Sequence, residues 1–281
     1  MSELPSQRAI EAGIARVRLL RARGAELSEG DDEIAMEEPL EIRVGGDLFA
    51  TTMRTPGSDH ELVAGFLYAE GVLRHHADVS GIVHCGRFDE PGYGNTMEVT
   101  LTAGAPTIAP EARRLGTVSS ACGVCGAASI EQLAARLTPL PAAPTFSAAW
   151  LQALPLALRQ VQPNFARTGG LHAAGLAHPD RGLLLVREDI GRHNAVDKVV
   201  GRLFLDQALP AAGSVLVVSG RAGFEIVHKA VAAGICGLVS VSAPSSLAIE
   251  TATRFGLLLI GFARDGGCNV YAGRTRLADV P

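Results

Sequence analysis

Long apolar runs, cysteine and surplus charge are all scarce in this chain of 281 residues. It has no run of about 18 apolar residues, so we expect no membrane-spanning helix. The N-terminal residues lack the apolar core of a signal peptide, so we expect no secretory leader. The formal net charge of −4 gives no general attraction to nucleic acid or to acidic membranes.

Cysteine occurs five times, and this odd, low number argues against a disulfide-stapled scaffold and favours a protein of the reducing cytoplasm. Hydrophobic residues make up 47% of the chain, which is enough for a sizeable core. The length allows one large domain or two ordinary ones.

Changes in pattern along the chain predict its organisation. The first residues are rich in Arg, Ala and Glu, and their apolar residues recur at the spacing of a short helix. A proline-rich stretch later in the chain is the best candidate linker. The expected units are a flexible N-terminal arm over residues 1–30, a smaller α+β domain over 31–138 that ends in a cysteine loop, a linker over 139–146, and an α/β domain over 147–281.

The first half reads as strands with one well-marked helix. Residues 38–44 and 48–55 predict two strands, joined by a glycine turn at 45–47. Ser58 and Glu61 have the spacing of a capping box, so we expect a helix to begin there.

The second half alternates short apolar runs with helical patterns. The runs at 183–186, 215–218, 238–241 and 257–260 are almost continuously apolar, which is typical of a buried, largely parallel or mixed sheet. Several of these runs end in Gly or Ser just before a helix. We therefore expect one rim of the sheet to bind anions or nucleotides.

The stretch S-S-A-C-G-V-C-G places Cys122 and Cys125 two residues apart, each followed by glycine. The small neighbours predict mobile, accessible thiols that could bind metal, exchange disulfides or carry a persulfide. There is no second CxxC, and nothing in the spacing recruits His84 and Cys85, so a structural zinc site is poorly supported. A thioredoxin-like pair would open a long helix, whereas residues 130–137 predict a short one.

Four motifs are candidates for the rim, and two of them are short. In T-G-G-L-H, the glycines allow close approach to a ligand near His172. Ala174 stands where a zinc deaminase has the Glu of H-x-E, and no P-C-x-x-C follows, so deaminase chemistry is not supported. In S-G-R, Ser219 and Arg221 form a plausible phosphate or base cradle.

The motif E-D-I-G-R-H-N-A-V-D-K precedes an apolar helical run. Asp189 and Asn194 could be helix caps. Capping does not explain Arg192, His193 and Lys198 near the same helix start, because the helix dipole disfavours cations there unless an anion is bound.

The final strand pair carries G-F-A-R-D-G-G and then N-V-Y. Phe262 could stack on a purine, and Arg264 could pair with phosphate or a guanine edge. Between these motifs, Ser245 or Ser246 in S-A-P-S-S is a helix cap.

Taken in order, S-x-A-C-G-x-C-G, T-G-G-x-H, E-D-x-G-R-H-N-A-x-D-K, S-G-R, S-A-P and G-F-A-R with N-V-Y resemble the formate dehydrogenase accessory sulfurtransferase family (FdhD), over residues of about 35 to 275. The resemblance implies a cytidine-deaminase-like α/β domain without zinc, a smaller N-terminal domain, and a cytoplasmic homodimer. It also implies that sulfur comes from a cysteine desulfurase as a persulfide and goes to a molybdenum bis(guanine dinucleotide) cofactor, which is then inserted into formate dehydrogenase.

In that pattern Cys122 matches the persulfide cysteine, with Cys125 assisting, and no permanent metal is expected. GDP or GMP would mimic the cofactor. The predicted cofactor-binding residues are Phe262, Ala263, Arg264, Asp265, Gly266, Gly267, Arg192, His193, His172, Ser219 and Arg221. Two other functions stay open, a thiol-disulfide oxidoreductase and a non-enzymatic chaperone that only holds the cofactor.

Overall fold

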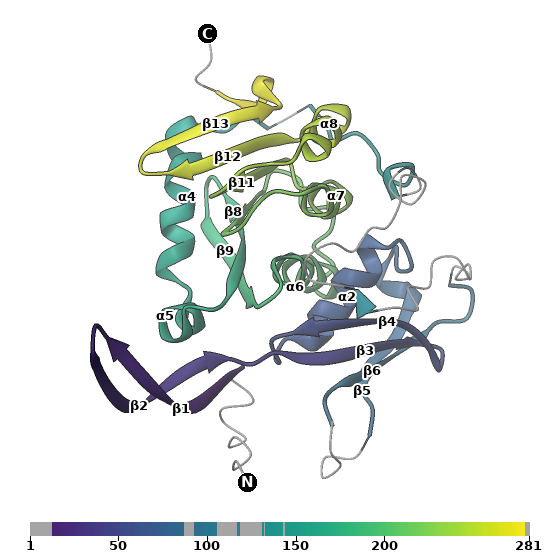
Figure 1. Ribbon diagram of the computed structural model, residues 1–281. Coiled ribbons are helices and arrows are strands. Elements are labelled where there is room, and N and C mark those ends of the chain that lie inside the picture. Colours follow the sequence, from purple (N-terminus) through teal and green to yellow (C-terminus); the bar gives the residue numbers. More distant parts are fainter. Residues whose placement is uncertain are drawn as a thin grey trace.

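A six-stranded mixed sheet with helices on both faces forms one half of the molecule (Figure 1). The computed structural model describes residues 13–86, 93–105, 117–118, 131, 133–142 and 144–278. The strands follow the order β13-β12-β11-β10-β8-β9. Their bounds are β8 His172–His178, β9 Gly182–Asp189, β10 Val215–Val218, β11 Gly237–Ser240, β12 Leu258–Arg264 and β13 Gly267–Ala272.

Strands β10, β11 and β12 are parallel, whereas β8, β9 and β13 each run antiparallel to the neighbour they pair with. The predicted α/β class, with a mixed sheet flanked by helices, is confirmed. The finer likeness to cytidine deaminases and the predicted domain boundaries stay predictions. Among the described residues, no helix has the length and apolar character needed to cross a membrane.

Strand β10 shows why these apolar runs are continuous. Val215 and Val217 pack toward α4 (Ala148–Gln160), in one hydrophobic cluster. Leu216 and Val218 belong to the cluster on the opposite face. That face is covered by α6 (Arg192–Leu205), α7 (Phe224–Ala232) and α8 (Ser246–Phe255). Side chains alternate between the two faces of a strand, so a strand covered on both faces needs apolar residues throughout.

A second, five-stranded sheet lies in the N-terminal half and has the order β5-β6-β3-β4-β7. Its two predicted strands and their glycine turn are confirmed, since Gly45 and Gly46 both have positive φ between β3 and β4. The strand bounds are β3 Glu38–Val44, β4 Asp47–Arg54, β5 Val79–His84, β6 Thr96–Leu101 and β7 Thr117–Val118. Helix α2 (Asp59–Ala69) packs on this sheet, and short 3-10 turns occur at His76–Asp78 and Arg274–Arg276.

The predicted capping box at the start of α2 is wrong. Ser58 has φ 57 and its side chain makes no capping hydrogen bond. Glu61 instead accepts a hydrogen bond of 2.7 Å from Arg187 of β9. The Glu61 carboxylate therefore pairs with Arg187 of a distant strand and does not cap the helix as the sequence pattern predicts.

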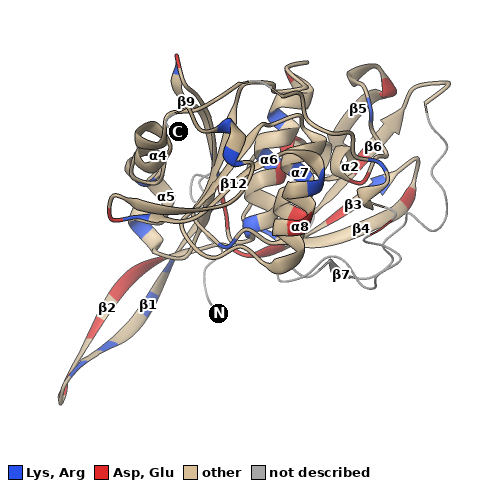
Figure 2. Ribbon diagram, turned by 90° about the horizontal axis from the view of Figure 1, so that it is seen from above, with Lys and Arg blue, Asp and Glu red and all other residues tan. Residues whose placement is uncertain are grey.

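The predicted short helix near the N-terminus is also wrong. Strands β1 (Ile14–Arg23) and β2 (Glu26–Ala35) form an antiparallel ribbon that projects from the body of the molecule (Figure 2). Near the base of the ribbon, Glu33 accepts from Arg167 of α5 (Pro163–Thr168) at 2.7 Å.

Helices α2 and α6 cross in backbone contact and so join the two halves. A Cβ atom added at Gly65 would lie 1.9 Å from the carbonyl oxygen of Asp197, and one added at Gly201 would lie 1.7 Å from that of Glu61. Real Cβ atoms never approach so closely, so only glycine allows this crossing.

Candidate functional site

Cys122 and Cys125 lie outside the described residues, so the structure leaves their predicted chemistry as a prediction. The described cysteines, Cys85, Cys236 and Cys268, are free thiols. Within the described ranges, no group of three or more His, Cys, Asp or Glu side chains could hold a metal ion.

A pocket of about 1000 Å³ lies between α4 and the edge of the large sheet where β10, β11 and β12 end. We call it the strand-end pocket. Helices α4 and α5 form its other wall. Six predicted cofactor-binding residues line it, namely His172, Ser219, Ala263, Arg264, Asp265 and Gly266.

Sheet topology explains why residues so far apart in sequence meet here. Parallel strands bring their carboxyl ends to one edge, which places Ser219 after β10 and the β12–β13 turn on the same rim. Because β8 runs antiparallel to β10, its first residue, His172, reaches that rim as well. The predicted strand-end rim is therefore present as a hollow surface.

His172 and Ser219 form the floor of the pocket. The Ser219 Oγ lies 3.4 Å from His172 Nδ1 and accepts a hydrogen bond of 2.9 Å from the backbone N–H of Ala173. Burial, reinforced by the charge of Arg192, lowers the pKa of His172 below its usual value. The imidazole is therefore neutral near pH 7 and can donate or accept a hydrogen bond without adding charge.

The β12–β13 turn is a strained hairpin at the mouth of the pocket. Asp265 and Gly266 have φ values of 54 and 75, as a two-residue type I′ turn requires. Phe262 also has positive φ, at 52, within a register shift of the strand pair, and its side chain is exposed. A bulky residue in this conformation costs about 1–3 kcal/mol, and such strain clusters at ligand sites.

Arg264 and Arg159 are the two arginines that line the pocket. The Arg264 guanidinium lies 5.9 Å from the Phe262 ring centroid, and that of Arg159 lies 3.9 Å from the centroid of Phe165. Neither guanidinium forms an ion pair with a carboxylate among the residues that the structure describes. Both are thus available to an anionic ligand.

The remaining predicted residues lie beside the pocket and are not part of its lining. Arg192 lies against Gly220 next to His172, since a Cβ added at Gly220 would be 3.6 Å from the Arg192 Cδ. His193 is buried and lies 3.5 Å from Glu225 of α7. The residues outside the lining are Phe262, Gly267, Arg192, His193 and Arg221.

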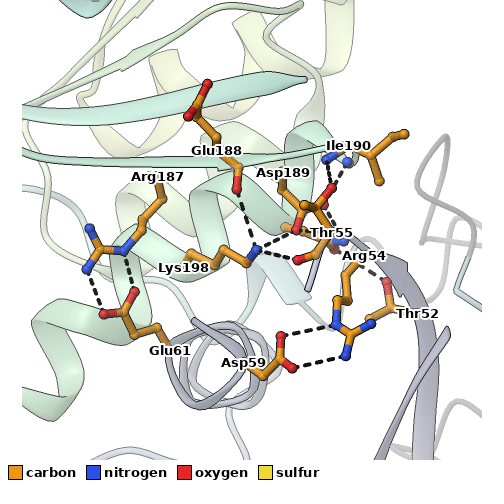
Figure 3. Close-up of polar contacts among 12 residues, drawn as sticks. Thr52, Arg54, Thr55, Asp59, Glu61, Arg187, Glu188, Asp189, Ile190 and Lys198 are labelled. Atoms are coloured by element: carbon orange, nitrogen blue, oxygen red, sulfur yellow. Dashed lines mark hydrogen bonds and ion pairs between the residues drawn. The ribbon is translucent and has the colours of Figure 1, made fainter. Parts of the chain in front are cut away.

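Part of the E-D-x-G-R-H-N-A-x-D-K motif serves the contact between the two sheets (Figure 3). Lys198 Nζ lies 2.7 Å from Asp189 Oδ2 and donates to the Thr55 carbonyl at 2.9 Å. The amide of Asn194 donates to Asp189 at 3.0 Å and to the Met53 carbonyl at 2.7 Å. We call these residues the inter-sheet junction.

The junction corrects two interpretations of the motif. Asp189 and Asn194 are not helix caps, because Gly191 is the N-cap of α6 and no side chain caps it. Lys198 does not join Arg192 at an anion site, because it is 2% exposed and paired with Asp189. The predicted cap at Ser245 is confirmed, since its hydroxyl accepts from the Ala248 N–H at 3.2 Å.

Sequence reasoning missed the wall made by α4 and α5. Helix α4 continues through Pro155, and its face toward the pocket carries Ala149 and Ala153. Small residues one turn apart leave space beside a helix, and this spacing is the signal that could have found the wall. The polar and aromatic residues on the same wall are Gln152, Arg159, Gln162 and Phe165.

Comparison with known proteins identifies the family of this chain. The chain matches the FdhD/NarQ family over residues 35–278. A protein of Anaeromyxobacter dehalogenans named sulfur carrier protein FdhD is 52% identical over 255 residues, which cover 88% of each chain. The protein of that name from Mycobacterium tuberculosis is 48% identical over 253 residues, covering 88% of this chain and 92% of the relative.

Among solved structures, a formate dehydrogenase accessory protein from Desulfotalea psychrophila shares the fold. The TM-score is 0.76 at 24% identity, over 94% of this chain and 99% of that one. The predicted resemblance is confirmed, and the chain belongs to the FdhD/NarQ family.

Proposed function

We propose that this protein accepts a persulfide sulfur on Cys122 and passes it to a molybdenum bis(guanine dinucleotide) cofactor held in the strand-end pocket, for insertion into formate dehydrogenase. The supporting observation is the pocket itself, which brings together six predicted cofactor-binding residues from three separate segments of the chain. Relatives about half identical to this chain are named sulfur carrier proteins.

The nucleotide part of the cofactor would lie on the rim. Arg264 would donate to phosphate, and backbone N–H groups of the hairpin and neutral His172 would supply uncharged hydrogen bonds. The exposed ring of Phe262 would pack on a base. The underlying sheet would be the cytidine-deaminase-like scaffold that the resemblance implies.

The sulfur step is a thiol exchange and needs no outside oxidant. The Cys122 thiolate attacks the terminal sulfur of a persulfide on a cysteine desulfurase. The donor S–S bond breaks, a new S–S bond forms on Cys122, and the donor cysteine leaves as a thiolate that takes up a proton. Cys125 assists this exchange, which takes place in the cytoplasm.

A second copy of the chain is the partner proposed for the β1–β2 ribbon. A two-stranded ribbon is marginally stable alone in water, and here Leu20 and Leu27 are 61% and 64% exposed. Its charges are segregated by strand (Figure 2). Strand β1 carries Arg16, Arg18, Arg21 and Arg23, whereas β2 carries Glu26, Glu29, Asp31, Asp32 and Glu33.

A twofold axis along the ribbon would place the basic strand of one copy over the acidic strand of the other. Light scattering should therefore give a dimer for the native chain and a monomer for the doubly substituted Leu20→Asp/Leu27→Asp chain. A native monomer would overturn the homodimer, and a dimeric variant would overturn the role of the ribbon.

Separation of function tests the sulfur-transfer proposal. Arg264→Ala should still take up sulfur from a cysteine desulfurase, seen by mass spectrometry as one added sulfur, yet fail to activate formate dehydrogenase. Cys122→Ala should do neither. Arg181→Ala, a change to an exposed arginine outside the pocket, is the control. Full formate dehydrogenase activity with Cys122→Ala would refute the assignment of that cysteine.

Further measurements separate the two alternatives. Reversible Cys122–Cys125 oxidation with turnover of disulfide substrates would favour a thiol-disulfide oxidoreductase. Formate dehydrogenase activation that survives loss of both thiols would favour a chaperone that only holds the cofactor. If Arg264→Ala is folded but cannot accept sulfur, loading and cofactor binding share one site.

A further inference from the structure

The strand-end pocket extends well beyond the rim residues that were predicted to bind the cofactor. The rim residues occupy one wall, and the cavity continues along α4 as far as α5 and Gly170. Figure 1 shows the β12–β13 hairpin beside the first half of α4 and α5 at its other end. A volume of about 1000 Å³ is at the upper limit for sites that enclose a small organic ligand. A nucleotide held at the hairpin would leave the α5 end open.

The α5 end carries its own recognition groups. The Arg159 guanidinium lies 3.9 Å from the centroid of the Phe165 ring, in the range of a close cation–π contact. Glu188 holds the first turn of α5, because it accepts from the backbone N–H groups of Asn164 and Phe165 at 3.0 and 2.8 Å. The Arg159 guanidinium thus lies against an aromatic ring, and its N–H groups are unpaired with any carboxylate of the described residues.

Gln162 is the second independent observation at this end. Its side chain is 4% exposed and lines the pocket. No hydrogen bond to its amide group forms within the residues that the structure describes. The amide atoms keep contact with solvent on the side of the pocket, where they offer a donor beside an acceptor. The edge of a purine or related heterocycle presents the complementary pair.

We propose that Arg159, Gln162 and Phe165 form a second subsite of the strand-end pocket, which takes the planar heterocyclic end of a dinucleotide whose phosphates lie at the rim. This inference rests on the proposed function, because it assumes that the hairpin end binds a guanine nucleotide. Arg159 stacks on or donates to the heterocycle, and Gln162 pairs with its edge. The pocket thus selects a two-ended ligand over a mononucleotide.

Two soluble probes test the subsite, GDP and diguanosine 5′,5′-pyrophosphate. Both contain one pyrophosphate, but the dinucleotide carries less negative charge, so any gain in affinity must come from the second nucleoside. By calorimetry on the full chain, we expect the dinucleotide to bind at least about tenfold tighter than GDP.

Arg159→Ala, Phe165→Leu and the isosteric Gln162→Glu should each reduce that affinity ratio to about threefold or less. Gln160→Leu, an exposed position on the last turn of α4 outside the lining, should leave the ratio unchanged. Arg264→Ala should weaken both probes, because it acts at the rim. Circular dichroism and thermal unfolding establish that each variant is folded.

Equal binding of the two probes by the native chain would refute the second subsite, as would a ratio that none of the three variants changes. Both results leave the proposed function intact, provided that GDP binding still depends on Arg264. Failure of the native chain to bind either probe would refute the rim site and the subsite together.

Discussion

The inter-sheet junction and the strand-end pocket both gather charged side chains, and they satisfy them in opposite ways. At the junction, Asp189 is fully buried and its two oxygens meet Lys198, Asn194 and backbone N–H groups. In the pocket, Arg159 and Arg264 have aromatic neighbours but no carboxylate partner among the described residues. A complete set of partners indicates a structural role, whereas unpaired cations around a cavity indicate a ligand.

The motif over residues 188–198 is continuous in the sequence, but the structure divides its residues between these two regions. Residues 188–198 contribute Asp189, Asn194 and Lys198 to the junction, while Arg192 lies beside His172 at the pocket floor. The junction holds the start of α6 against β4, so it also fixes the position of Arg192. One continuous motif therefore supplies the junction and also places Arg192 beside the pocket.

The largest effect is expected where the two halves touch. Gly201→Ala would place a methyl group 1.7 Å from the Glu61 carbonyl oxygen, so α2 and α6 would have to separate. The expected loss is about 5 kcal/mol or more, comparable with the whole stability of many domains. Urea unfolding measures it. Gly81→Ala, where an added Cβ meets no atom within 4 Å, is the control, and equal effects would contradict backbone contact at the crossing.

Next comes the junction ion pair. Lys198→Met leaves Asp189 buried without its cation, which should cost about 3–5 kcal/mol in urea unfolding. Arg202→Met removes an exposed ion pair with Asp206 on the same helix and should change stability far less. If the two variants lose the same stability, the junction is not the structural element that its burial suggests.

How much of this could be read from the sequence differs between elements. Strand β10 has the bounds predicted for it, because a run buried on both faces is apolar without interruption. The β1–β2 ribbon was missed because its Arg and acidic residues make sense only as cross-strand pairs, such as Arg16 with Glu33 and Arg18 with Asp31. The spacing of apolar residues within residues 10–20 suggests a helix, because it carries no information about the pairing of this segment with β2.

The candidate site shows the same division. Rim residues were predictable where they lie at or just after the end of an apolar run, as Ser219 and Arg264 do, and the topology then brings His172, at the start of β8, beside Ser219. Arg159 and Gln162 were missed because the small residues of α4 indicate only that space lies beside the helix, and not which polar side chains will line that space. The ion pair that takes Glu61 from its helix end is equally invisible without Arg187 of β9.

His228 lies outside both regions and tests the rule that buried polar atoms are partnered. Its Nε2 has no hydrogen-bond partner among the residues that the structure describes, and burial, with a smaller contribution from Lys229, lowers the pKa of His228 to about 4. Between about pH 4 and 6.5 this histidine binds more protons in the unfolded chain than in the folded one, so His228 should contribute a rise in stability with pH of about 2–3 kcal/mol. Burial raises the pKa of Asp197 to about 6, so that carboxyl contributes a fall in stability with pH over an overlapping range.

Urea unfolding from pH 4 to 7 isolates the histidine when the native chain is compared with His228→Leu, because the Asp197 contribution is present in both. The native chain should gain about 2–3 kcal/mol relative to His228→Leu as the pH rises through this range. His76→Leu, which changes an exposed histidine, should follow the native chain. A difference between the native chain and His228→Leu that stays constant with pH would contradict the neutral, buried imidazole.

The smallest effect is expected at the pocket rim, and it bears most directly on the comparison. Arg264→Ala should leave stability almost unchanged, because the side chain is exposed, but weaken GDP binding by about tenfold or more, since one charge-assisted phosphate contact is lost. Arg264→Lys keeps the charge without the planar guanidinium, so its affinity for GDP should lie between those of the native chain and of Arg264→Ala.

Calorimetry at low and moderate salt measures the GDP affinity of both variants. The difference in affinity from the native chain should shrink as salt screens the phosphate contact. Unchanged affinity in Arg264→Ala would remove the hairpin from the site, and unpaired cations would then no longer distinguish the pocket from an ordinary charged surface.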